Sequence, residues 1–173
     1  MADPSTAPQQ ALTEQDARQV LRLREEKAVA DRSDQFYLRD SYEVRDLASK
    51  AHQSFGGSRS PLRNLERVAL GAAAFGDIID FIKSQTGRTT QIGEEWSRHD
   101  FGPRLHDMLW GRVREEAEER AERLFEELRA PVREALKEAG ETKRDLKRRL
   151  RLAYAQCYIQ HLVAHHDFID GTQ

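Results

Sequence analysis

The sequence predicts an all-α protein, a helical bundle of about five helices, and three observations lead to this fold class. Apolar residues recur three and four positions apart over most of the 173-residue chain. No segment shows the sustained alternation with β-branched residues that is typical of a strand. Breaks between the apolar runs coincide with glycine or proline, for example at Gly56-Gly57, Gly87, Pro103 and Gly140.

Composition limits the class of protein further. The chain holds 28 basic and 30 acidic residues, and this balance excludes a globally basic nucleic-acid coat. A single cysteine excludes a disulfide framework and a multi-cysteine zinc site. No apolar run approaches the roughly 18 residues of a membrane span, and no secretory signal is visible at the N-terminus. We therefore expect a soluble, cytoplasmic protein without membrane contact.

The first helices follow a polar start. Residues 1–11 contain little to bury and are predicted to be a disordered tail, which leaves 12–173 as a single α-helical domain. Thr13 and Asp16 have the spacing of a capping box and predict the start of the first helix. A second helix is expected from about 34 to 52, and its continuity with the first is left open because no glycine or proline separates them.

The most apolar part of the chain is predicted to be its central, most buried helix. The apolar segment covers 62–85. Ser60-Pro61 precedes it and predicts the helix start, with a favourable hydroxyl N-cap followed by proline. Residues 89–102 are expected to be a polar connection. A long helix then starts at Pro103.

Two features divide the C-terminal part of the chain. Pro131 falls inside the apolar pattern of the long helix and should kink or end it. Gly140 closes that helix. Thr142 then opens the last one, which is predicted to continue to about Phe168.

The first candidate site is a basic cluster at the start of the last helix. Its cations are Lys143, Arg144, Lys147, Arg148, Arg149 and Arg151. Six cations on the first turns of one helix could neutralise several phosphates of a nucleic-acid backbone. The alternative is that they pair with the acidic face of Arg114–Arg129, which holds seven glutamates and four arginines.

The second candidate site flanks the most apolar segment. It combines cations with an aromatic ring: Arg59, Arg63, Lys83, Arg88 and Trp96. Such a set favours single-stranded RNA, because cations contact phosphates while an exposed tryptophan stacks on a base. The alternative is that the cations cap helix ends and the tryptophan packs in the core.

The third candidate site is a stripe of metal-binding residue types near the C-terminus. Cys157, His161 and His165 are four residues apart, so adjacent pairs could chelate a metal. All three cannot easily reach one ion, because eight helical residues rise about 12 Å. The alternative is a core cysteine, with histidines favoured near a helix C-terminus. No phosphate-binding loop or nucleophile motif is present, so we expect neither an enzyme nor a cofactor.

Two stretches also resemble a known family. DIIDFIKSQTGR, which follows an apolar helix with a leading R-N-L, and the later LRLAYAQCYIQHL resemble the small helical subunits of type III CRISPR effector complexes and helical proteins encoded beside them. This resemblance implies a non-catalytic α-helical subunit of an RNA-guided assembly. It also implies backbone contacts to nucleic acid from Arg63, Lys83 and Arg88.

Three functional hypotheses follow. The first is a subunit that binds RNA or a ribonucleoprotein, together with other protein subunits, in a prokaryotic CRISPR-type antiviral defence complex. The second is a protein–protein adaptor or self-associating scaffold, possible as a homo-oligomer, with Arg114–Leu136 as its partner surface. The third and least favoured is a metal-dependent helical enzyme that uses the C-terminal histidines.

Overall fold

The computed structural model describes residues 13–38 and 40–171, and the predicted disordered tail lies outside this part of the chain. The described residues form nine α-helices and no strand. The helices are α1 (Glu14–Leu38), α2 (Ser41–Phe55), α3 (Ser60–Gly71), α4 (Phe75–Thr86), α5 (Gln91–Ser97), α6 (Phe101–Met108), α7 (Arg114–Glu126), α8 (Ala130–Glu138) and α9 (Lys143–Gly171). A 3₁₀ turn, η1 (Arg98–Asp100), precedes α6, and a π-helical turn, η2 (Leu109–Val113), precedes α7. The all-α class is confirmed, and the count of about five helices is too low.

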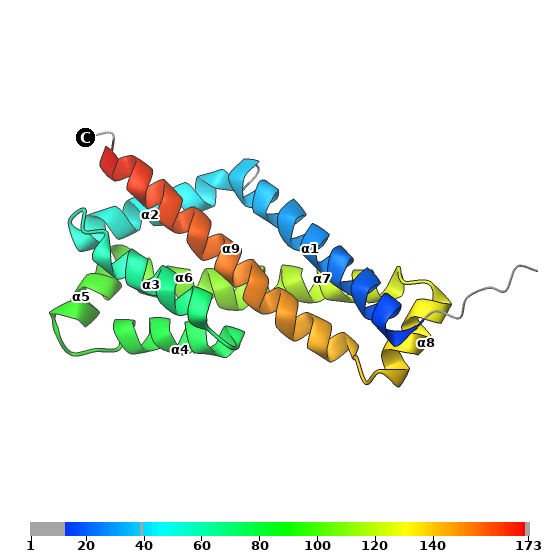
Figure 1. The fold of residues 1–173 in the computed structure, drawn as a ribbon. Coiled ribbons are helices and arrows are strands. Elements are labelled where there is room, and N and C mark those ends of the chain that lie inside the picture. The colour runs from blue at the N-terminus through cyan, green and yellow to red at the C-terminus, as the bar shows by residue number, and fades with distance from the viewer. Residues whose placement is uncertain (1–12, 39, 172–173) are drawn as a thin grey trace, which may run out of the picture.

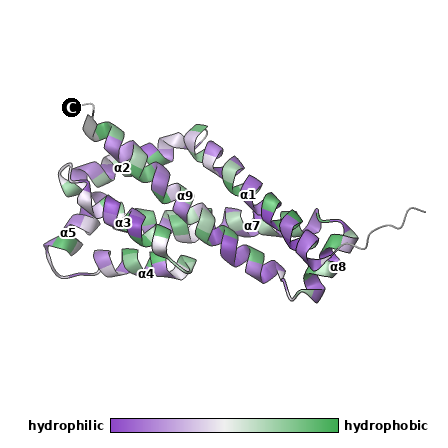
Figure 2. Ribbon diagram, viewed as in Figure 1, coloured by the Kyte–Doolittle hydropathy of each residue, from purple (hydrophilic) through white to green (hydrophobic). Residues whose placement is uncertain are grey.

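The longest helix, α9, is the centre of the fold. It crosses the elongated bundle from the end formed by α8 to the end formed by α2 (Figure 1). It packs against α1, α2, α3, α4 and α7. The ribbon coloured by hydropathy shows green residues recurring along α9 between the purple ones (Figure 2). Its buried residues include Leu146, Leu150, Tyr154, Tyr158, Ile159 and Leu162.

The mid-chain segment is therefore not the central helix that its apolar content predicts. It breaks into α3 and α4, and Ala72 between them has an extended backbone. The carboxylate of Asp77 caps the new helix by accepting the backbone N–H of Ala73 at 3.0 Å and that of Ala74 at 2.8 Å. A local helix cap thus divides the apolar segment 62–85, which the apolar pattern alone predicts to be one continuous helix.

The two predicted threonine starts are confirmed. The Thr13 hydroxyl accepts the backbone N–H of Asp16 at 3.1 Å, and the Asp16 carboxylate accepts the Thr13 N–H at 3.1 Å. Thr142 and Asp145 repeat this arrangement at 3.2 Å in both directions. Aspartate therefore serves as the acidic member of a capping box that usually contains glutamate or glutamine.

Close packing shapes the region expected to be a polar connection. Residues 91–97 form α5, and a Cβ atom on Gly93 would lie 1.8 Å from the carbonyl oxygen of Arg88. Only glycine permits this approach. The proline prediction is confirmed, because α7 ends before Pro131 and this residue lies in the first turn of α8. Across the described residues, none of the helices combines the length and apolar content needed to span a membrane.

Candidate functional site

The basic cluster at the start of α9 forms an ion-pair ladder with α7, which we call the α7–α9 ladder. The two helices pack against each other, and both place charges four residues apart. The pairs are Lys143–Glu126 at 3.6 Å, Lys147–Glu122 at 2.5 Å and Arg151–Glu118 at 2.9 Å. The alternative interpretation of the sequence, pairing with the acidic helix, is therefore confirmed for these three cations.

The other cations of the cluster divide into two kinds. Arg149 donates to both carboxylate oxygens of Glu25, at 2.6 and 3.0 Å, and to Glu141 at 2.7 Å. The hydrogen bond with Glu25 is the main reason that the pKa of Arg149 is raised. Arg148 has only a 3.5 Å contact with Asp145, and Arg144 is exposed. Within the described part of the chain, no ion pair to a glutamate is found for Arg144 or Arg148.

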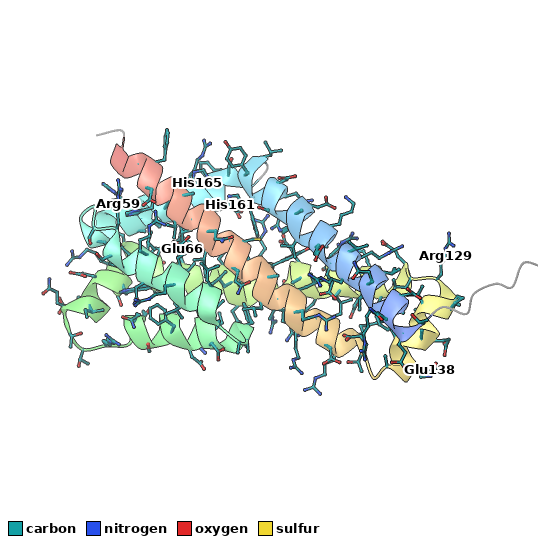
Figure 3. All side chains as sticks on the ribbon, viewed as in Figure 1. Arg59, Glu66, Arg129, Glu138, His161 and His165 are labelled. Carbon is teal, nitrogen blue, oxygen red and sulfur yellow. The ribbon has the colours of Figure 1, made fainter. Side chains whose placement is uncertain are left out.

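The arginines of α3 are also drawn into ion pairs. Arg63 donates to Glu66 at 2.9 Å and to Asp167 of α9, and these bonds raise its pKa. Arg59 lies 3.8 Å from the same aspartate. Figure 3 shows Arg59, directly before α3, and Glu66 on α3, beside the C-terminal half of α9. These arginines therefore fasten α3 to α9.

The expected exposed tryptophan is buried. Trp96 is 2% exposed, and its ring centroid lies 5.5 Å from that of Phe55, 5.9 Å from that of Phe81 and 5.4 Å from that of Phe101. The prediction that it stacks on RNA bases is wrong, because packing against three phenylalanines leaves its faces no access to a ligand. The alternative, a core tryptophan, is confirmed. The remaining cations are exposed, and Lys83 lies on α4 whereas Arg88 lies in the connection between α4 and α5.

The C-terminal cysteine and histidines do not assemble a metal centre. Among residues 13–38 and 40–171, no group of three or more histidine, cysteine, aspartate or glutamate side chains is placed to hold a metal ion. The Nε2 atom of His161 lies 3.0 Å from the Ser33 hydroxyl, and burial lowers the pKa of this histidine. Burial also lowers the pKa of His165, and the nearby Arg45 lowers it further. Burial raises the pKa of Cys157, which disfavours a thiolate ligand.

The predicted partner surface is also buried. The apolar stripe of Arg114–Leu136 is divided between α7 and α8 and faces the interior, with Ala117, Ala121, Leu124 and Leu136 at most 1% exposed. The placement of the partner surface on this stripe is therefore wrong. The stripe packs inside the bundle, where α7 meets α9 and α8 meets α1.

A different surface was missed by the sequence analysis. Four large apolar side chains are exposed near the α1–α2 turn and the end of α9: Tyr37 at 63%, Leu38 at 76%, Tyr42 at 81% and Phe168 at 70%. We call these four residues the aromatic surface. Sequence spacing could not reveal it, because an apolar residue in a helical pattern is normally assigned to the core.

A groove of about 490 Å³ continues this surface between α2 and α6. Tyr42, Leu47 and Met108 supply its apolar part. Its charged lining is Glu43, Asp46, Arg104, Asp107 and Arg112. With three acids and two arginines, this lining has a formal charge of -1.

Comparison with known proteins adds no assignment. No protein family matches this chain, and no curated protein or solved structure matches it either. The resemblance to type III CRISPR subunits stays a prediction from two short stretches.

Proposed function

We propose that this protein is a non-enzymatic helical adaptor that binds a partner protein through its aromatic surface. The observation that carries the proposal is the exposure of Tyr37, Leu38 and Tyr42 within six residues of the chain. Exposed apolar groups that gather at one place mark interaction sites, whereas single ones are ordinary. Tyrosine is enriched at such interfaces because its large rigid ring retains a polar tip.

The geometry of α9 extends this surface. The ring centroid of Tyr37 lies 6.3 Å from that of His161. Phe168 follows His161 by seven residues, which is close to two helical turns and keeps it on the same face. Figure 3 shows His161 and His165 along this C-terminal half of α9. The α1–α2 turn and the end of α9 thus contribute to one surface.

The groove beside Tyr42 indicates the chemistry of the partner. Its arginines are neutralised within the chain, since Arg104 contacts Asp46 at 3.3 Å and Arg112 bonds to Glu43. The side chain of Asp107 is 82% exposed at the rim. An amphipathic helix with an apolar anchor and flanking lysine or arginine residues complements such a groove.

The ion pairs of α9 favour protein binding over RNA binding. Lys143, Lys147 and Arg151 are in the α7–α9 ladder, and Arg149 is held by Glu25 and Glu141. Every cation already paired with a carboxylate must lose that partner before it neutralises a phosphate. The aromatic surface requires no such exchange.

Site-specific photo-cross-linking in the native host tests the adaptor function. A photoreactive phenylalanine analogue replaces Tyr42 in one variant. In a matched control it replaces Leu23, an equally helical, exposed apolar residue of α1. Leu23 lies fourteen residues before Tyr37, about 21 Å along the helix axis.

The expected result is a covalent adduct with one protein at position 42 and none at position 23. Mass spectrometry should place the cross-link in a basic, amphipathic segment of that partner. No adduct at position 42, or equal adducts at both positions, would overturn the proposal. An adduct between two copies of this chain would replace the adaptor with a self-associating scaffold.

The second candidate is the ribonucleoprotein subunit implied by the resemblance, and the exposed Arg144 and Arg148 favour it. Both cations are available without disruption of a glutamate pair in the described structure. Filter binding with single- and double-stranded RNA at low salt tests it. Affinity that falls steeply with salt and with Arg144→Glu/Arg148→Glu supports this function, whereas no binding at low salt removes it.

A further inference from the structure

A second groove lies on another part of the molecule, between the start of α4 and the N-terminal third of α9. It has a volume of about 560 Å³, within the range of small-molecule sites. Its lining on the α4 side consists of small residues, Ala73, Ala74 and Gly76, followed by the ring of Phe75. A Cβ atom on Gly76 would meet nothing within 4 Å, so this side of the groove is open.

Trp110 supplies an aromatic wall. It is 45% exposed, in contrast to the buried Trp96, and belongs to the π-helical turn η2. Such turns are frequent at functional sites because they shift a side chain out of the regular helical register. Its ring is nearly parallel to that of Phe75, with centroids 6.1 Å apart and an interplanar angle of 20°.

A second ring and two cations also lie beside Trp110. The ring of His106 is nearly parallel to it, with centroids 6.4 Å apart and an interplanar angle of 13°. The guanidinium carbon of Arg114 lies 4.8 Å from the ring centroid of Trp110, and the Lys83 ammonium lies 5.8 Å from it. Lys83 was predicted as an RNA contact from the sequence, and the structure places it beside this tryptophan. A tryptophan flanked by cations can stack a neutral nucleobase while nearby cations attract the phosphate attached to that base.

The α9 side of the groove carries three arginines and two acids. They are Arg148, Arg149, Arg151, Glu141 and Asp145. Both acids are engaged within the chain, since Glu141 accepts from Arg149 at 2.7 Å and Asp145 caps Thr142. The side chain of Arg148 is 70% exposed, and its contact with Asp145 is 3.5 Å long. Arg148 is thus the lining cation that can turn to an incoming anion at least cost.

We propose that this groove binds a nucleoside phosphate, with the base on Trp110 and the phosphate on Arg148. Trp110, which is 45% exposed, provides the stacking surface, the buried Phe75 packs against it, and guanidinium groups match phosphate geometry. The same chemistry is offered by a free mononucleotide and by one nucleotide of a single strand. This proposal goes beyond the adaptor function, since its residues are separate from the aromatic surface.

Calorimetric titration of the full chain with adenosine monophosphate tests the proposal. Adenosine and inorganic phosphate, titrated separately, measure the two halves of the ligand. Tryptophan fluorescence gives a second reading, because stacking on Trp110 should quench its emission while Trp96 is shielded in the core. Circular dichroism of each variant confirms that the helices are intact.

Arg148→Ala should raise the dissociation constant about tenfold, as expected for the loss of a charged hydrogen bond. The matched control is Arg144→Ala, one turn earlier on the same helix and outside the groove, and it should leave the constant unchanged. Trp110→Ala should weaken binding by about tenfold or more, in line with the loss of one base-stacking contact.

Three results would overturn the proposal. The first is the absence of saturable binding at millimolar adenosine monophosphate. The second is an equal loss of affinity for the nucleotide in Arg148→Ala and Arg144→Ala. The third is inorganic phosphate that binds as tightly as the nucleotide. Tighter binding of a short oligoadenylate, again weakened by Trp110→Ala, would support the site and assign it to a single strand. The Tyr42 cross-linking result does not depend on any of these outcomes.

Discussion

Two regions of this molecule use the same charged residue types in different surroundings. In one, Arg32 of α1 is buried with 7% of its side chain exposed, and it donates to Asp40 at 2.6 Å and to Glu116. Arg112, with 37% of its side chain exposed, extends this network from the buried Asp40, at 2.9 Å, to the half-exposed Glu43 and Glu116. In the other, the α7–α9 ladder lies at the surface.

The contribution of a charge pair to stability therefore depends on its solvent exposure. Two buried ions lose most of their hydration, so removal of one leaves the other uncompensated and costs about 3–5 kcal/mol. An exposed pair is screened and contributes little to the free energy of unfolding. The buried network therefore stabilises the α1–α2 junction, next to the aromatic surface, while the ladder chiefly occupies the cations of α9.

The largest expected effect comes from Arg32→Met. This change removes the buried cation between Asp40 and Glu116 and leaves both carboxylates only the half-exposed Arg112, so we expect a loss of about 2–3 kcal/mol in the free energy of unfolding. Urea denaturation followed by circular dichroism measures it. Arg22→Met is a matched control, since Arg22 lies on the same helix with 74% of its side chain exposed and should change little. Similar losses in both variants would contradict the comparison.

The next effect concerns Asp40. Burial opposes its ionisation, but hydrogen bonds and charges from Arg32 and Arg112 outweigh burial and hold the pKa of Asp40 below its ordinary value of 3.8. Because the folded pKa is the lower one, its stabilisation is complete above pH 3.8 and is lost as pH falls through the folded pKa.

Asp40→Asn should therefore flatten the acid limb of the stability profile. It should also reduce stability at neutral pH by about 2 kcal/mol, since neutral amides bind arginine less strongly than carboxylates do. Urea midpoints measured from neutral pH down to pH 3 give both quantities. An acid limb as steep as that of the wild type would show that Asp40 is not its source.

A smaller effect is expected within the ladder. Arg151→Ala removes the pair with Glu118, whose two side chains are 31% and 28% exposed. We expect a loss of about 1 kcal/mol, at the upper end for surface pairs, because the aliphatic part of the arginine also packs. The urea midpoint checks this value, and a loss as large as that of Arg32→Met would erase the distinction between the two regions.

The smallest effect is expected for Lys147→Ala. Its partner Glu122 lies at the surface, and the hydrogen bond from Lys147 lowers the pKa of this glutamate. Water and salt screen the pair, so the urea midpoint should stay within the scatter of replicate curves. A clear loss of stability that disappears in high salt would mean that the ladder contributes more than its exposure predicts.

Much of the fold was predictable because it depends on local rules. Short-range hydrogen bonds define two helix starts, at Thr13–Asp16 and at Thr142–Asp145. Pro131 predicts a break between two helices, because its ring removes the backbone N–H that a helix interior needs. The division of 62–85 was not predictable from apolar content, since the Asp77 cap competes with a continuous apolar run that favours one helix.

The candidate site was less predictable, because exposure depends on tertiary neighbours. The ladder could be proposed from the opposite charge blocks that lie close together in the sequence, although α8 separates the two helices. The sequence pattern does not distinguish the burial of Trp96 from that of Trp110. In the structure, three phenylalanines bury Trp96, whereas Trp110 lies exposed in a π-helical turn. Tyr37 and Tyr42 fit a helical pattern equally well whether they face the core or the solvent.

Co-purification from the native host, with the retained proteins quantified by mass spectrometry, tests whether the aromatic surface binds a partner protein. Two variants with intact helices are compared: Tyr37→Ala/Tyr42→Ala, which alters the aromatic surface, and Arg144→Ala/Lys147→Ala, which alters the cations of α9. We expect the first to lose a protein partner which the second retains at the wild-type level. Loss of that partner from the cation variant, with full retention by the tyrosine variant, would contradict it.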